Sequence, residues 1–133
     1  MIGVDTNVLV RPLVGDDPPQ AEAATRFLQA HCSAEDPALV CEIVLVETAW
    51  VLEDVYEYTR AQICAAFEGV LVTAQLRVGA SSSVLAALQK YRLGAADFAD
   101  CLLGVGNVRA GCSYTATFDR KAARLEDFRL IPA

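Results

Sequence analysis

The first residues of the chain contain the feature that most constrains its fold, a short apolar run that ends at a carboxylate and leads into a helix start. Residues 2–4 have the length and composition of a buried strand, and Asp5 ends that strand abruptly. Asn7 then precedes a second apolar run with a helical pattern. Because functional side chains of open parallel α/β sheets gather where strands end and helices begin, Asp5 is a candidate site residue. The alternative is that Asp5 and Asn7 only cap the helix.

Length and composition indicate a single globular domain over residues 1–133. A chain of this length buries roughly two thirds of the surface that its unfolded form exposes, which one core can provide. Hydrophobic residues make up 54% and charged residues 21%, a balance that excludes a disordered or low-complexity protein. No apolar run approaches the roughly 20 residues that span a bilayer, and the first residues lack the pattern of a basic region followed by a signal-length apolar core. We therefore expect a cytoplasmic protein without a membrane partner.

The cysteine, histidine and charge content narrows the chemistry further. Five scattered cysteines without a Cys-x-x-Cys pair predict buried, reduced thiols and no zinc site, and a single histidine, His31, argues against a His-based triad. The net charge of −6 is unfavourable for binding phosphates. Two divalent cations held by converging carboxylates would offset four of those charges, so acidity alone does not exclude a nucleic-acid substrate.

Glu47 is the second candidate carboxylate. A strand is predicted over 38–41 and a helix over 43–58, and Glu47 lies among apolar neighbours in that helix. An ionised carboxylate buried without a partner costs several kcal/mol, so Glu47 should be either at the surface or bound to a cation. Alternatively, Glu47 and Asp54 mark a solvated helix edge, and Glu42 at the strand end is the nearest rival for a site role.

A further acidic pair lies in residues 95–111. On a helix, Asp97 and Asp100 project from one face, and Gly104 and Asn107 continue that stripe with little bulk. Two like charges one turn apart destabilise a helix slightly unless a cation lies between them. The alternative is a pair of acids at a helix start, favoured by the helix dipole.

Asp119 repeats the arrangement at Asp5, because it directly follows a predicted strand over 112–117 and opens a helix. Basic residues beside it, including Arg120, suit phosphate oxygens but equally an ordinary surface. The remaining pattern predicts helices over 59–67 and 81–91 and strands over 76–78 and 128–131. The whole chain thus predicts the α/β class with a mostly parallel sheet.

Four acidic motifs, in this order and spacing, resemble those of PIN-domain ribonucleases, and the VapC-type toxins of toxin–antitoxin pairs most closely. They are Asp5-Thr6-Asn7, Val46-Glu47-Thr48-Ala49-Trp50, Phe98-Ala99-Asp100-Cys101-Leu102 and Thr117-Phe118-Asp119. The resemblance covers essentially the whole chain. It implies a single PIN-like domain, a three-layer α/β/α fold with a mostly parallel central sheet of four to five strands.

The resemblance also implies a metal-dependent endoribonuclease that hydrolyses RNA through a metal-activated water. Hard cations such as Mg²⁺ or Mn²⁺ prefer oxygen ligands, and either one or two ions would serve. The expected catalytic metal ligands are Asp5, Glu47, Asp100 and Asp119, with Asp97 as an auxiliary ligand. Thr117 and Asn7 are expected to hold carboxylates or water by hydrogen bonds, and Arg11 and Arg120 are possible phosphate contacts. A cognate VapB-type antitoxin and a homodimer are the partners that the family implies.

Three alternatives remain open from the sequence. A catalytically silent PIN-like protein-binding module would keep the acids as structure. A haloacid-dehalogenase-like phosphatase also places Asp after its first strand, but it typically has a second Asp where this chain has Asn7. A response-regulator receiver would need paired acids near its start and a phosphoacceptor Asp after a middle strand, and neither is evident.

Overall fold

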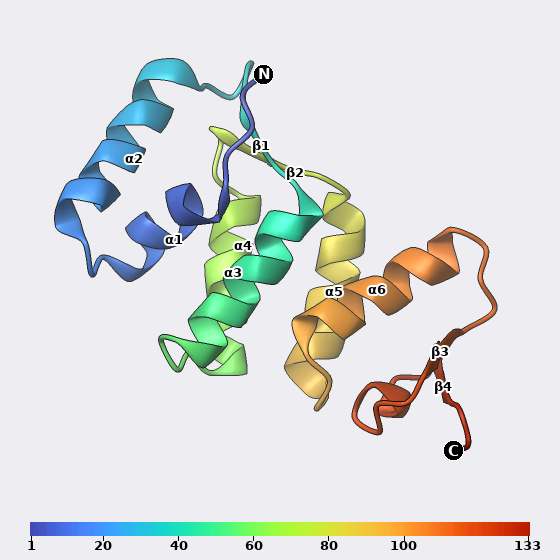
Figure 1. Ribbon diagram of the computed structural model, residues 1–133. Helices are drawn as coiled ribbons and strands as arrows, with labels where there is room; N and C mark the ends of the chain where they lie inside the picture. The colour runs from blue at the N-terminus through green and yellow to red at the C-terminus, as the bar shows by residue number, and fades with distance from the viewer. The chain divides into compact units, whose positions relative to one another are not determined.

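The computed structural model describes residues 1–133 and divides them into two compact units, residues 1–80 and 81–133 (Figure 1). Each unit combines helices with one pair of parallel strands, which confirms the predicted α/β class. The longest helix has 14 residues, and none of the helices has the length and hydropathy of a bilayer span.

The first unit contains four helices and two strands, and the paired strands are β1 (Ala38–Val40) and β2 (Leu76–Val78). They run parallel, with Leu39 opposite Arg77. The helices are α1 (Thr6–Val14), α2 (Pro18–His31), α3 (Glu42–Asp54) and α4 (Arg60–Leu71). Large fully buried side chains of α3 and α4, Leu45, Leu52, Ile63 and Phe67, form much of its core.

The boundaries of these helices follow from local signals in the sequence. Gly15, with φ of 74°, ends α1 in the left-handed conformation that glycine adopts without strain, and Asp17 caps the start of α2. Thr59 and Gln62 form a capping box at the start of α4. In Figure 1, α1 and α2 form a hairpin, yet α2 buries none of its own residues.

The second unit contains two long helices and the other parallel strand pair. Helices α5 (Ser81–Leu93) and α6 (Phe98–Arg109) pack side by side (Figure 1), with the Tyr91 and Phe98 rings edge to face at 6.0 Å. Strands β3 (Thr115–Thr117) and β4 (Phe128–Leu130) pair in parallel, and the 3₁₀ helix η1 (Ala122–Arg124) lies between them in sequence.

Strand β2 has its predicted bounds, whereas β1, β3 and β4 are shorter than predicted, and the strands form one parallel pair in each unit. Residues 2–4 make only one parallel bridge, Gly3 with Leu39, because the chain turns into the cap of α1 at Asp5. The helix predicted over 43–58 ends at Asp54, and Glu57 adopts a left-handed φ of 57° beyond it. The helix predicted over 59–67 continues to Leu71 across Gly69, since Phe67 and Val70 are buried on its inner face.

All five cysteines are free in the structure. Cys32, Cys64 and Cys101 are buried, whereas Cys41 and Cys112 are exposed. The expectation of buried thiols is therefore wrong for these two positions, because Cys41 lies between β1 and α3 and Cys112 lies in the segment between α6 and β3.

Candidate functional site

Asp5 lies at its predicted position, between the β-bridge at Gly3 and the first turn of α1. One of its carboxylate oxygens, Oδ1, accepts a hydrogen bond from the Val8 backbone N–H at 3.4 Å, so Asp5 caps the helix. The residue is exposed, and its second oxygen takes no part in the cap. Capping and ligand binding are therefore compatible at this carboxylate. Asn7, by contrast, is an exposed residue inside α1 and does not cap it.

Glu47 lies on the exposed side of α3, with buried Thr48 and Ala49 directly after it. The sequence predicted that Glu47 lies either at the surface or against a bound cation, and the structure shows it at the surface. The nearby acids Glu42 and Asp54 are also exposed, at the two ends of the same helix. Exposure alone does not distinguish a ligand from a solvated helix edge.

Asp97 and Asp100 form the start of α6. Asp97 precedes the helix as its N-cap, and its Oδ1 accepts a hydrogen bond from the Asp100 backbone N–H at 2.8 Å. Both carboxylates therefore lie at the positive end of the helix dipole. The prediction that the two acids lie close together is confirmed, although Asp97 stands before the helix and not within it.

Asp119 is held at the end of β3 by a turn of its own. Its Oδ1 accepts hydrogen bonds from the backbone N–H groups of Lys121 at 2.7 Å and Ala122 at 3.2 Å. Thr117 Oγ1 accepts a hydrogen bond from the Asp119 backbone N–H at 3.0 Å. Thr117 therefore orients the backbone of Asp119.

Within the second unit the structure brings Asp97, Asp100 and Asp119 close enough to influence one another. Partial burial raises the pKa of Asp100 from its ordinary 3.8 to about 6, and the negative charge and hydrogen bond of Asp97 and the charge of Asp119 add to this shift. No cationic side chain forms a salt bridge with any of the three. The cluster consequently holds excess negative charge that a cation would relieve.

The donor chemistry of the predicted acids fits a hard divalent cation, since every donor is a carboxylate oxygen. Asp5 and Glu47 belong to the first unit, and Asp97, Asp100 and Asp119 belong to the second. Neither unit by itself arranges three or more His, Cys, Asp or Glu side chains as a metal-binding group.

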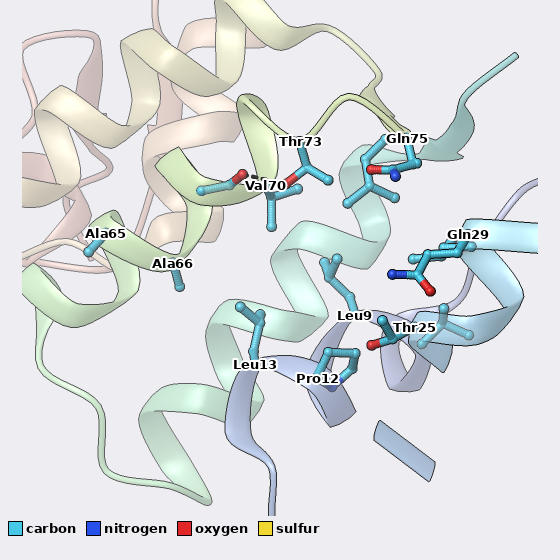
Figure 2. A pocket seen from close by; sticks show the side chains of 14 residues that line it. Leu9, Pro12, Leu13, Thr25, Gln29, Ala65, Ala66, Val70, Thr73 and Gln75 are labelled. Atoms are coloured by element: carbon cyan, nitrogen blue, oxygen red, sulfur yellow. Dashed lines mark hydrogen bonds between the residues drawn. The ribbon is translucent and has the colours of Figure 1, made fainter. Parts of the chain in front are cut away.

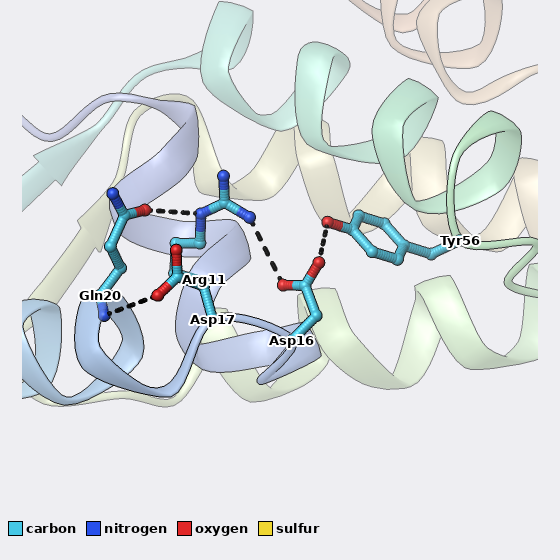
Figure 3. Close-up of polar contacts among 5 residues, drawn as sticks. All are labelled: Arg11, Asp16, Asp17, Gln20 and Tyr56. Carbon is cyan, nitrogen blue, oxygen red and sulfur yellow. Dashed lines mark hydrogen bonds and ion pairs between the residues drawn. The ribbon is translucent and has the colours of Figure 1, made fainter.

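The two predicted phosphate contacts differ in their surroundings. Figure 3 shows Arg11 donating to Gln20 Oε1 at 2.8 Å and to Asp16 Oδ1 at 3.4 Å, while the Tyr56 hydroxyl donates to Asp16 Oδ2 at 2.7 Å. The hydrogen bond from Tyr56 is the main reason that the pKa of Asp16 is lowered. Arg120, in contrast, is exposed and forms no salt bridge. A phosphate could approach Arg120 directly, whereas Arg11 would first have to leave Asp16.

Two features of the structure were missed by sequence reasoning. The first is an apolar cavity of about 480 Å³ in the first unit, where α1, α2 and α4 face one another (Figure 2). Leu9, Leu13, Leu28 and Val70 line it together with uncharged polar side chains such as Gln29. The second is Asp127, a buried acid paired with Lys90 at 3.1 Å in the second unit. Its position directly before the apolar β4 was visible in the sequence, but its partner lies 37 residues away.

Comparison with known proteins gives two matches that cover most of the chain. The model of the PIN domain family matches residues 2–127, a range that includes all five predicted acids. A protein of Aquifex aeolicus (strain VF5) named VapC ribonuclease is 25% identical over 122 residues, which is 92% of this chain and 90% of that protein.

Proposed function

Because the chain belongs to the PIN domain family, we propose that it is a metal-dependent endoribonuclease and the toxin of a VapBC-type toxin–antitoxin pair. The observation that carries the proposal is the family match over residues 2–127, which spans the four acidic motifs in order. The relative named VapC ribonuclease supports RNA as the substrate. In this proposal residues 1–133 act as one PIN-like domain in the cytoplasm.

The proposed metal ligands are Asp5, Glu47, Asp100 and Asp119, with Asp97 as an auxiliary. The environment of Asp100 supports this assignment, since a carboxylate whose pKa is raised by partial burial and by its acidic neighbours is stabilised in its charged form by a bound cation. Bound Mg²⁺ or Mn²⁺ would supply an activated water and stabilise the charge that develops on the phosphate oxygens.

The side chains of the protein have three further roles in the proposed reaction. Thr117 keeps the Asp119 turn in place through its hydroxyl, and Asn7 is proposed to orient a carboxylate or water. Arg120 is proposed to contact a substrate phosphate, with Arg11 as a second contact. Since the attacking group is water and not the ribose 2′-hydroxyl, the products should carry 5′-phosphate and 3′-hydroxyl ends.

A cognate VapB-type antitoxin is the proposed protein partner, and the toxin is proposed to act as a homodimer. An antitoxin that places an Arg against the acids and apolar side chains on exposed Trp50 would match the chemistry of the chain. Apolar side chains of the antitoxin are also proposed to bind in the apolar cavity that α1, α2 and α4 line. Helix α2 has no buried residue, so this side of the first unit is open to a partner. Native mass spectrometry of the chain with and without a candidate antitoxin would reveal both assemblies.

The test of the nuclease is cleavage of a mixed RNA pool with Mg²⁺ or Mn²⁺, with EDTA, and with Asp5→Asn in parallel. Asn is as good a helix cap as Asp, so this variant should fold while losing a metal ligand. Asp54→Asn, which changes an exposed acid on α3 outside the motifs, is the matched control. Metal-dependent cleavage that disappears in Asp5→Asn and persists in Asp54→Asn supports the proposal.

Cleavage that persists equally in Asp5→Asn would show that a contaminant produces it. A folded chain that binds metal through these acids but cleaves no RNA, even after any antitoxin has been removed, would instead indicate a silent PIN-like binding module.

A further inference from the structure

Asp97 caps helix α6 and Asp100 lies in its first turn, whereas Asp119 follows strand β3, so the separation of these acids depends on contacts between α6 and the strand pair. One connection is a hydrogen bond from Asn107 Nδ2 on α6 to Thr115 Oγ1 on β3 at 2.9 Å. The second is a close approach between Gly104 on α6 and the start of β4. Gly104 and Asn107 are the two residues that continue the acidic stripe along the helix.

Gly104 permits this approach because it has no side chain. A Cβ at this position would lie 2.6 Å from Cε1 of Phe128 and 2.8 Å from Oδ2 of Asp127. Both distances are shorter than real Cβ contacts, so a side chain at position 104 would force Phe128 and Asp127, or the start of β4 that carries them, to move. Glycine at position 104 therefore allows β4 to pack closely against α6, and it does not leave space for substrate.

Asp127 is held at the same place by two other elements, α5 and β3. Its carboxylate is buried, and Oδ2 accepts a hydrogen bond from Lys90 Nζ of α5 at 3.1 Å. Its backbone carbonyl accepts a hydrogen bond from the Thr115 backbone N–H at 2.8 Å, which connects it to β3. Its other oxygen, Oδ1, has no hydrogen-bond partner. A buried carboxylate with one cationic partner is held strongly in one place, because leaving Lys90 would leave it unpaired.

We propose that Asp127, held by Lys90 against the bare backbone of Gly104, is a positioning residue that sets the separation of Asp100 and Asp119. Gly104 is one helical turn beyond Asp100 on α6. A movement of β4 relative to Gly104 is therefore also a movement relative to Asp100. Strand β4 passes the shift to β3, because Phe128 pairs with Thr115 and the Ile131 N–H donates to the Thr117 carbonyl at 2.8 Å. Thr117 in turn holds Asp119. The catalytic consequence rests on the proposed metal-dependent function.

The test compares Gly104→Ala with Gly106→Ala. Both changes add one methyl group to α6, but a Cβ at Gly106 meets nothing within 4 Å. Amide signals of metal-free, ¹⁵N-labelled protein report the position of the Asp119 turn, and titration with Mn²⁺ reports the assembled ligands. We expect Gly104→Ala to shift the amide signals of residues 119–122 and to weaken Mn²⁺ binding roughly tenfold, the scale seen when groups that orient metal ligands are lost. Gly106→Ala should change neither.

A second substitution separates positioning from simple loss of stability. Phe128→Leu removes the ring atom nearest to the new Cβ but leaves the contact with Asp127 Oδ2, so adding it to Gly104→Ala should restore part of the Mn²⁺ affinity. Two results would overturn the proposal. One is that Gly104→Ala leaves the amide signals of residues 119–122 where they are in the parent, and the other is that it binds Mn²⁺ as tightly as the parent at a temperature well below the melting temperature of the variant. Should the parent bind no Mn²⁺, the proposed metal chemistry fails, and the amide signals alone decide the positioning claim. Should Gly104→Ala not fold, Asp127→Asn replaces it in the same measurements.

Discussion

The Asp100 backbone N–H donates a hydrogen bond to the Asp97 carboxylate at 2.8 Å, so the two acids are joined by the geometry of a helix cap. Asp97 therefore has two separable effects on its neighbour. Its oxygen stabilises the start of α6, and its negative charge raises the pKa of Asp100. A substitution that keeps the cap but removes the charge distinguishes them.

Asp97→Asn should fold at least as stably as the parent at pH 7, because Asn caps helices as well as Asp and the repulsion of Asp100 is removed. Asp97→Ala loses the cap and should lower the free energy of unfolding by about 1 kcal/mol. Urea denaturation of the three proteins checks both values. An equal loss in Asn and Ala would show that the capping hydrogen bond contributes nothing.

Asp100 should make the metal-free protein less stable as the pH rises through 6. Its folded-state pKa of about 6 lies above the ordinary 3.8, so the folded state binds the proton more tightly than the unfolded state does. This destabilisation is absent below pH 3.8 and complete above pH 6. Asp100→Asn should remove it and gain roughly 1 kcal/mol at pH 8, a value reduced for solvent screening. Thermal unfolding of both proteins between pH 4 and 8 measures the difference, and parallel curves would contradict it.

Much of the fold could be predicted because its signals are local. Gly15 ends α1, and Thr59 and Gln62 begin α4, through contacts within four residues of each cap. The positions of Asp5 and Asp119 could also be predicted from local sequence, since the residues next to each acid indicate where a strand ends and a turn or helix begins. The clustering of Asp97 with Asp100 follows from their spacing on a helix start.

The features that sequence reasoning missed depend on distant parts of the chain. Asp127 becomes buried only because Lys90, 37 residues earlier, supplies its counter-charge. Gly104 was predicted to leave space beside the acids, but Phe128 occupies that space. Strand length also depends on hydrogen bonds that an apolar run does not encode, and the 2–4 segment makes only one bridge before it turns at Asp5.

Lys90→Met should destabilise the protein by about 3 kcal/mol, since it leaves the Asp127 carboxylate buried without a cation. Adding Asp127→Leu should recover most of that loss, because an apolar pair can replace a buried ion pair. Lys121→Met is the control, as Lys121 is exposed and forms no salt bridge, and its effect should stay within about 0.5 kcal/mol. Urea denaturation at pH 7 gives all three values. A Lys90→Met protein as stable as the control would show that the ion pair does not hold Asp127.

Thr117→Val should weaken Mn²⁺ binding and RNA cleavage roughly tenfold while leaving the fold intact. Valine has nearly the shape of threonine but lacks the oxygen that accepts the Asp119 N–H, so the turn that presents the Asp119 carboxylate loses one of its hydrogen bonds. The turn still keeps the contacts from Lys121 and Ala122 to Asp119 Oδ1, and for that reason the loss should be partial. Thr117→Ser restores the hydroxyl and should recover both activities. If serine and valine behave alike, the hydroxyl has no role, and the shape of residue 117 alone supports Asp119.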